Sequence, residues 1–132
     1  MFKISKRAIG TQPPIEYVEP TASEAFSMGE VLVLTSGKAT KAGATATPEF
    51  VCQKTYTAPA SGAEKIPVIR ITEDMEFETK AQAELTSVNV GDKVTLHTDG
   101  LQVTATTTSG VFMITEEHGT AAGSTVRGMF RR

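Results

Sequence analysis

Residues 90–105 read VGDKVTLHTDGLQVTA, and this stretch predicts a complete β-hairpin. Asp99-Gly100 supplies the residues favoured at the centre of a type I′ turn, where both positions need φ > 0. Folding the stretch about that pair gives one apolar face, made of Val94, Leu96, Val103 and Ala105. The opposite face is polar and holds Thr95, His97, Gln102 and Thr104. Because turn chemistry and strand alternation agree, the register is predicted too.

An earlier stretch follows the same pattern. Residues 28–42 read MGEVLVLTSGKATKA and match the hairpin with one residue fewer at the turn. The alignment sets Met28 on Val90, Gly29 on Gly91, Glu30 on Asp92, Leu32 on Val94, Leu34 on Leu96, Gly37 on Gly100 and Phe50 on Phe112. This similarity predicts two copies of one unit, although any two hairpins look alike over so short a span.

Length and composition favour one small all-β domain. The chain has 132 residues, no Trp and only 6% aromatic residues, and its Gly and Pro are spread as punctuation between runs rich in Thr and Val. Such a chain can bury about two-thirds of the surface that its unfolded form exposes. We expect a small β-barrel or sandwich of short antiparallel strands, with two related hairpin units and an extended N-terminal arm.

The expected division is an extended N-terminal arm at residues 1–20 and a single β domain at residues 21–132. Three prolines prevent a continuous ladder in the arm: Pro13, Pro14 and Pro20. Ile15, Tyr17 and Val18 give the arm apolar side chains to bury. It either packs along its own domain or a neighbouring subunit, or frays as an ordinary terminus.

Candidate reactive residues are few, and the sequence predicts no catalytic residue, no cofactor, no metal ligand set and no enzymatic activity. Cys52 is the only cysteine, which excludes an intramolecular disulfide, and we expect it in the core. His97 is expected at the surface or at a subunit interface. Residues 116–118, Glu-Glu-His, are expected as solvated turn residues, with a weak cation site as the alternative.

Charge is segregated along the chain, although the net charge is only −2. The small net charge gives no reason to expect direct nucleic-acid binding or a membrane partner. The start of the chain lacks an apolar segment typical of a secretory signal, so we expect synthesis in the cytoplasm. Both ends are basic, at Lys3, Lys6, Arg7, Arg127, Arg131 and Arg132, while the middle of the chain is acidic. They either serve solubility or dock together on an acidic protein surface.

Three stretches together resemble the capsid decoration, or head cement, proteins of bacteriophages. They are Ser27–Ala42, Ile66–Thr79 (IPVIRITEDMEFET) and Val90–Phe130, which ends in GVFMITEEHGTAAGSTVRGMF. The resemblance covers most of the chain after residue 21, whereas the stretch before Thr21 has no counterpart in the pattern.

This resemblance implies a non-enzymatic virion structural protein on the capsid exterior. Such proteins bind the major capsid protein of the expanded icosahedral shell, often as trimers at local symmetry axes, and strengthen it against internal DNA pressure. We therefore expect a homotrimer made in the host cytoplasm. The alternatives are a tail or head-fibre connector component and a small β-barrel ligand-binding module, the latter with a polar pocket near His97.

Overall fold

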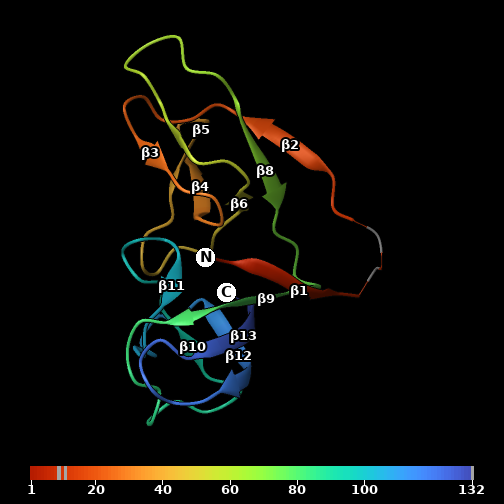
Figure 1. The fold of residues 1–132 in the computed structure, drawn as a ribbon, viewed down its shortest axis with the longest axis vertical. Helices are drawn as coiled ribbons and strands as arrows, with labels where there is room; N and C mark the ends of the chain where they lie inside the picture. Colours follow the sequence, from red (N-terminus) through yellow and green to blue (C-terminus); the bar gives the residue numbers. More distant parts are fainter. Residues whose placement is uncertain (9, 11, 132) are drawn as a thin grey trace.

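The structure is a computed structural model and describes residues 1–8, 10 and 12–131; within them every regular element is a strand (Figure 1). The strands are β1 (Lys3–Arg7), β2 (Ile15–Val18), β3 (Ala25–Phe26), β4 (Val31–Thr35), β5 (Lys38–Lys41), β6 (Phe50–Cys52), β7 (Tyr56–Thr57), β8 (Ile66–Arg70), β9 (Met75–Ala81), β10 (Lys93–Val94), β11 (Gln102–Val103), β12 (Phe112–His118) and β13 (Thr125–Phe130). The expectation of an all-β chain of short strands is confirmed.

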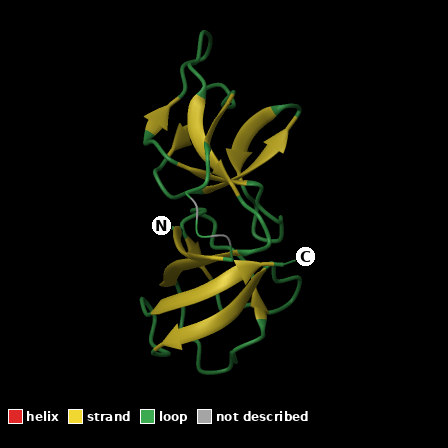
Figure 2. Cartoon of the chain, turned by 90° about the vertical axis from the view of Figure 1, so that its right-hand side faces the viewer, coloured by secondary structure: helices red, strands yellow, loops and turns green. Residues whose placement is uncertain are grey.

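Two main sheets lie one above the other (Figure 2). The first sheet has the strand order β2-β8-β6-β4-β5. The second has the order β1-β9-β13-β12-β10, and β11 also pairs with β9. β3 and β7 form a separate two-stranded sheet. We call residues 15–71 the first unit and residues 75–131 the second unit.

Both units use the same pairing scheme. In the first, the chain just after β2 returns to the far end of the sheet, where Pro20 pairs in parallel with Ala39 of β5. In the second, β11 likewise runs parallel to β9, and the hairpin contact between Leu96 and Val103 joins β11 to β10. Backbone pairing therefore runs around each unit, which places the fold between a sandwich and a barrel.

Hydrogen bonds confirm that the two units are related. Four bonds of the first unit recur 62 positions further along the chain. The pairs are Gly29 N–Cys52 O and Gly91 N–Ile114 O (both 2.8 Å), Cys52 N–Glu30 O and Ile114 N–Asp92 O (2.8 and 2.9 Å), Glu49 N–Leu32 O and Val111 N–Val94 O (2.8 and 3.0 Å), and Ser27 N–Glu30 Oε2 and Asn89 N–Asp92 Oδ2 (3.0 and 2.9 Å). The sequence similarity thus reflects a repeated structure.

The two hairpins differ at their turns. Ser36 and Gly37 both have positive φ (51° and 78°), as a type I′ turn requires. In the second hairpin only Gly100 does (68°), so the predicted type I′ turn at Asp99-Gly100 is wrong. The extra residue there allows a turn closed from Gly100 N to His97 O (3.0 Å), followed by one left-handed glycine.

The predicted strand register of that hairpin is confirmed beyond the turn. Leu96 lies opposite Val103, and the hydroxyl groups of Thr95 and Thr104 are 2.7 Å apart. The apolar pair Leu96 and Val103 is buried, as predicted from the alternation. The local pattern therefore determines which side chains meet, whatever turn type joins the strands.

The core consists of two hydrophobic clusters, and the larger one contains residues of both units. One cluster fills the first unit and includes Leu32 and Phe50. The larger cluster fills the second unit, and Val31 and Val51 of the first unit belong to it. Neighbouring residues of β4 therefore face two different cores, as the apolar run at Val31 predicts for a strand buried on both faces. The shared core joins the units into one body.

The N-terminal segment packs along its own chain. β1 pairs antiparallel with β9, β2 pairs antiparallel with β8, and Phe2 is buried in the larger core. Ile15 and Tyr17 are not buried within the chain, since they are 47% and 64% exposed, and their burial against a neighbouring subunit stays a prediction. Only Val18 packs against a core, because alternate side chains of a strand point to opposite faces. The boundary between residues 20 and 21 stays a prediction.

Candidate binding surfaces

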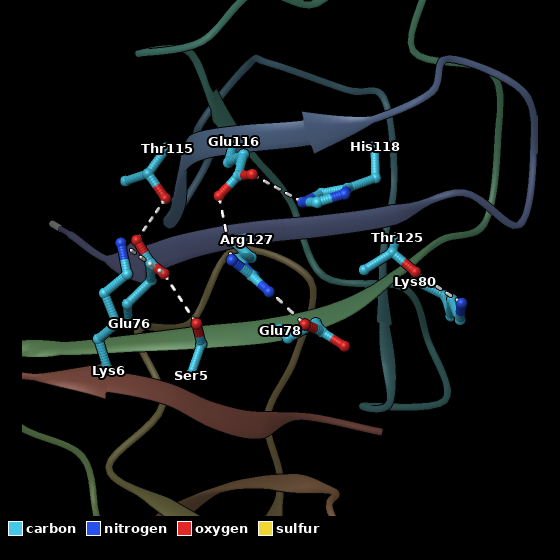
Figure 3. A network of polar contacts seen from close by, with 10 residues as sticks. All are labelled: Ser5, Lys6, Glu76, Glu78, Lys80, Thr115, Glu116, His118, Thr125 and Arg127. Carbon is cyan, nitrogen blue, oxygen red and sulfur yellow. Dashed lines mark hydrogen bonds and ion pairs between the residues drawn. The ribbon is translucent and has the colours of Figure 1, made fainter.

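A polar network covers the outer face of the second sheet (Figure 3). At its centre the buried Glu76 carboxylate accepts hydrogen bonds from the hydroxyl groups of Ser5 and Thr115, each at 2.9 Å. The Lys6 ammonium is 3.8 Å from the same carboxylate. These contacts join β1, β9 and β12, which satisfies a carboxylate that would otherwise be costly to bury.

Arg127 continues this network across β13. Its guanidinium lies 3.2 Å from Glu78 and 3.2 Å from Glu116, and the other Glu116 oxygen is 2.8 Å from Nε2 of His118 (Figure 3). The hydrogen bond to Glu78, followed by the charge of Glu116, raises the pKa of Arg127. The cation therefore stays charged between two carboxylates, and the row ties three strands together.

Residues 116–118 do not form the solvated turn that we expected from the sequence. β12 continues to His118, and a register shift after Ile114 keeps Glu116, Glu117 and His118 paired with β13. Glu116 and His118 contact each other on the polar face of the sheet, so their polarity does not mark a loop. Across the described part of the chain, no group of three or more His, Cys, Asp or Glu side chains could hold a metal ion.

The basic residues of the two ends meet acidic residues of the same chain. β1 and β13 both lie against β9, whose neighbourhood is acidic. Arg7 is 4.0 Å from the Asp74 carboxylate, and Arg131 donates a 2.7 Å hydrogen bond to the Glu73 carbonyl. Arg132 lies outside the described residues. Docking of both ends on a partner's acidic surface stays a prediction.

His97 lies beside the turn of the second hairpin. Its Nδ1 is 3.2 Å from Asp99 Oδ1, and Asp99 also accepts hydrogen bonds from Gln102 Nε2 and the Leu101 amide, both at 2.8 Å. Burial would raise the pKa of Asp99, but the bonds from Gln102, Leu101 and His97 outweigh it and the pKa is lowered. The cluster therefore stabilises the turn with a charged Asp99.

Two buried ionisable groups lie in the first unit. Glu30 is 1% exposed, its Oε2 accepts the Ser27 amide (3.0 Å), and burial raises its pKa. Cys52 is fully buried, as expected, and donates to the Lys54 carbonyl (3.1 Å). Burial also raises the pKa of this thiol, which keeps it protonated and unreactive at neutral pH.

Apolar side chains are exposed at a few positions. Ile15 and Tyr17 lie on one face of β2, and Met28 and Val90 occupy equivalent positions of the two units (52% and 62% exposed). The sequence aligns Met28 with Val90 but does not say that both are exposed. The exposed pair on one face of β2 can contribute to a protein interface.

A cavity of about 230 Å³ lies between β1 and the first sheet. Phe2, Ile4, Val51, Ile69 and Phe77 form much of its wall. This lining suits an apolar side chain or a small apolar ligand. It lies away from His97, where the sequence suggested a pocket.

Comparison with known proteins adds no relative to this description. No protein-family model matches the chain, and a search of curated proteins also finds no match. Within residues 1–8, 10 and 12–131, no helix is long and apolar enough to cross a membrane.

Proposed function

We propose that the chain is a decoration protein of a bacteriophage head. It binds the major capsid protein on the exterior of the expanded shell and stabilises that shell. The support is that two of the three stretches that carry the family resemblance contain corresponding hairpins of the two units. Ser27–Ala42 contains the β4–β5 hairpin, and Val90–Phe130 contains β10 to β13.

The shared core is the observation that carries this proposal. Val31 and Val51 of the first unit are buried in the same cluster as Phe77 and Phe112 of the second. A body built this way resists shear between its halves, because sliding would expose both core faces to water. Such rigidity suits a protein that reinforces a shell under load. In this proposal three copies form a homotrimer at a local symmetry axis.

Reconstitution on heads tests the proposal. Expanded heads that lack the chain are mixed with purified protein, sedimented and analysed by quantitative mass spectrometry. We expect hundreds of copies per head, in a fixed ratio to the major capsid protein, and a higher melting temperature of the shell. A handful of copies per particle would indicate the tail or head-fibre connector instead. The absence of binding would reject the decoration role.

The cavity beside β1 favours a second candidate function, a ligand-binding module. Ile69 lines the cavity and is partly buried. Ile69→Trp would fill the space, so it should abolish binding of a small apolar ligand. Retained binding of an apolar fluorescent dye by this variant would reject the second candidate.

A further inference from the structure

Among the described residues, no strand lies beside the outer edge of β2 at residues 15–18. β2 is the outermost strand of the first sheet, and within the described residues only β8 pairs with residues 15–18 (Figure 1). Pro13 and Pro14 precede the strand, and Pro20 follows it. Because proline cannot donate to a ladder, these residues limit the open edge to about one short strand.

The ladder shows which backbone groups face the open edge. Gln53 N donates to Pro67 O (2.9 Å) in β8, so the backbone groups of Pro67 point toward β6. Antiparallel ladders alternate, and Tyr17 lies opposite Pro67. The N–H and C=O groups of Tyr17, and of Ile15 two residues earlier, therefore point away from β8 and into the open edge.

The second unit shows what fills this edge. Thr21 N donates to Ala39 O (2.9 Å), and Gln82 N donates to Val103 O (2.8 Å), which aligns the chain after β2 with the end of β9. Tyr17 lies four residues before Thr21, and Glu78 lies four residues before Gln82. Tyr17 and Glu78 therefore occupy equivalent positions of the two units.

By the same alignment, Ile15 and Glu76 occupy equivalent positions of the two units. Glu78 and Glu76 are the residues of β9 that face Lys3 and Lys6 of β1. The edge that is open in the first unit is therefore covered in the second by an extended antiparallel strand.

We infer that the open edge of β2 binds an extended segment of the major capsid protein, running antiparallel to β2 as β1 runs to β9. This inference rests on the proposed function. The segment differs from β1 in its side chains. Lysines of β1 face Glu76 and Glu78, whereas the equivalent residues of β2 are the exposed Ile15 and Tyr17. The bound segment therefore carries apolar side chains at two alternate positions.

A second copy of this chain fits the edge less well. Pairing two β2 strands so that both Ile15 and Tyr17 are used places Glu16 directly opposite its own copy. Like charges in that position destabilise a sheet. Glu16 is already held by Arg70 through contacts of 2.9 and 3.0 Å, so it cannot turn away without losing them.

Substitutions at Tyr17 test the inference on heads that lack the chain. Tyr17→Pro removes an N–H group that bonds nothing within the first sheet, and Tyr17→Lys places a charge against the apolar segment. Val90→Lys is the matched control, because Val90 is almost equally exposed (62% against 64%) but lies in the second unit. We expect both Tyr17 variants to lose at least about tenfold in affinity, and the control to bind like the parent. Melting temperatures verify that each variant is folded.

Amide hydrogen exchange gives the second readout. Binding to heads should slow exchange at the amides of Ile15 and Tyr17, which face the open edge and have no backbone partner among the described residues. If the parent binds, the variants bind equally and these amides exchange as before, the inference is overturned while the proposed function stands. If the parent protein does not bind to heads, both the proposed function and this inference are rejected. If the two amides become protected in the free chain as its concentration rises, the occupant is a second copy and the inference is wrong.

Discussion

The two units have the same strand-pairing scheme but different side chains in their cores. In the second unit the ring of Phe112 packs against Phe130 and Phe2, with centroids 5.1 and 5.7 Å apart. In the first unit, Phe50 is the counterpart of Phe112. The hydrogen bonds Ile71 N–Glu49 O and Arg131 N–Val111 O are also equivalent. Arg70, just before Ile71, is therefore the counterpart of Phe130, just before Arg131. The Arg70 guanidinium lies 4.8 Å from the Phe50 ring centroid. A cation therefore takes the place of an aromatic ring.

This difference separates what backbone and side chains each determine. The turns at Gly29 and Gly91 and four hydrogen bonds recur in both units, so they depend little on which side chains fill the core. The second unit is completed by β1 and Phe2, whereas the first ends in the polar pair Arg70 and Glu16 beside an open edge. We conclude that the second unit is the better packed half and the first is the half prepared for a partner.

The largest expected effect comes from the two equivalent aromatic residues. Phe112→Ala should cost about 5 kcal/mol and Phe50→Ala about 3 kcal/mol, since truncation of a buried Phe costs roughly 3–5 kcal/mol. Phe112 also loses two aromatic neighbours, each worth about 0.5–1.5 kcal/mol. Urea unfolding of both variants measures the difference. Equal costs would show that the aromatic cluster adds nothing to the second unit.

The next effect concerns a glycine that the first unit does not share. Val68 of β8 corresponds to Gly128 of β13, where an added Cβ would overlap the Met113 carbonyl oxygen and the Phe112 ring. Gly128→Val should therefore cost about 3 kcal/mol, at the upper end for overpacking. Gly43 has open space around it, so Gly43→Val is the control, and both are compared by thermal unfolding. A stable Gly128→Val variant would contradict this packing.

A smaller effect distinguishes the buried Glu30 from its counterpart Asp92. Burial raises the pKa of Glu30 above its ordinary value of 4.5. The folded state therefore binds the proton more tightly than the unfolded state. The stabilisation from the protonated Glu30 is therefore complete when the pH is below its ordinary pKa. It is lost as the pH rises through the pKa that Glu30 has in the folded state. The loss is about 1.4 kcal/mol for every tenfold difference in proton affinity between the two states.

Glu30→Gln should remove this loss and raise stability at pH 7 relative to the parent. Asp92→Asn, which keeps a side chain of equal size at the equivalent turn, is the comparison and should not raise it. Unfolding free energies measured from pH 4 to pH 8 test both variants. The raised pKa of Glu30 would be contradicted if the stability of the parent only rose from pH 4 to pH 8 and Glu30→Gln followed the same curve.

The smallest effects belong to the exposed pair Met28 and Val90. Neither side chain is part of a core cluster, so Met28→Ser and Val90→Ser should each change stability by less than about 0.5 kcal/mol. Chemical denaturation of the two variants checks this. A loss above about 1 kcal/mol in only one of them would show that the two positions are not equivalent.

Local patterns in the sequence were enough for the hairpins and their relation. Gly29 and Gly91 mark equivalent turns, both with positive φ (83° and 97°). The shared core and the parallel pairing of β11 with β9 were not predictable, because they join residues far apart in sequence. A hairpin pattern shows which side chains share a face but not what covers that face.

The same limit explains the errors at the candidate surfaces. Residues 116–118 look like a loop because they are polar, and only the positions of Glu78 and Arg127 on other strands show that they lie on a sheet face. Ile15 and Tyr17 alternate as buried residues do, but the covered face of β2 is the one that holds Val18. An open edge is a property of the assembled sheet and has no sequence signal of its own.

A cryo-electron microscopy map of heads carrying the chain, at a resolution that shows side chains, tests the central claim most directly. We predict many copies on the outer surface, each anchored through its first unit, with a strand of the major capsid protein lying antiparallel to Ile15–Val18. A map with no density for the chain, or with β2 facing solvent and the chain bound only through its second unit, would contradict the account.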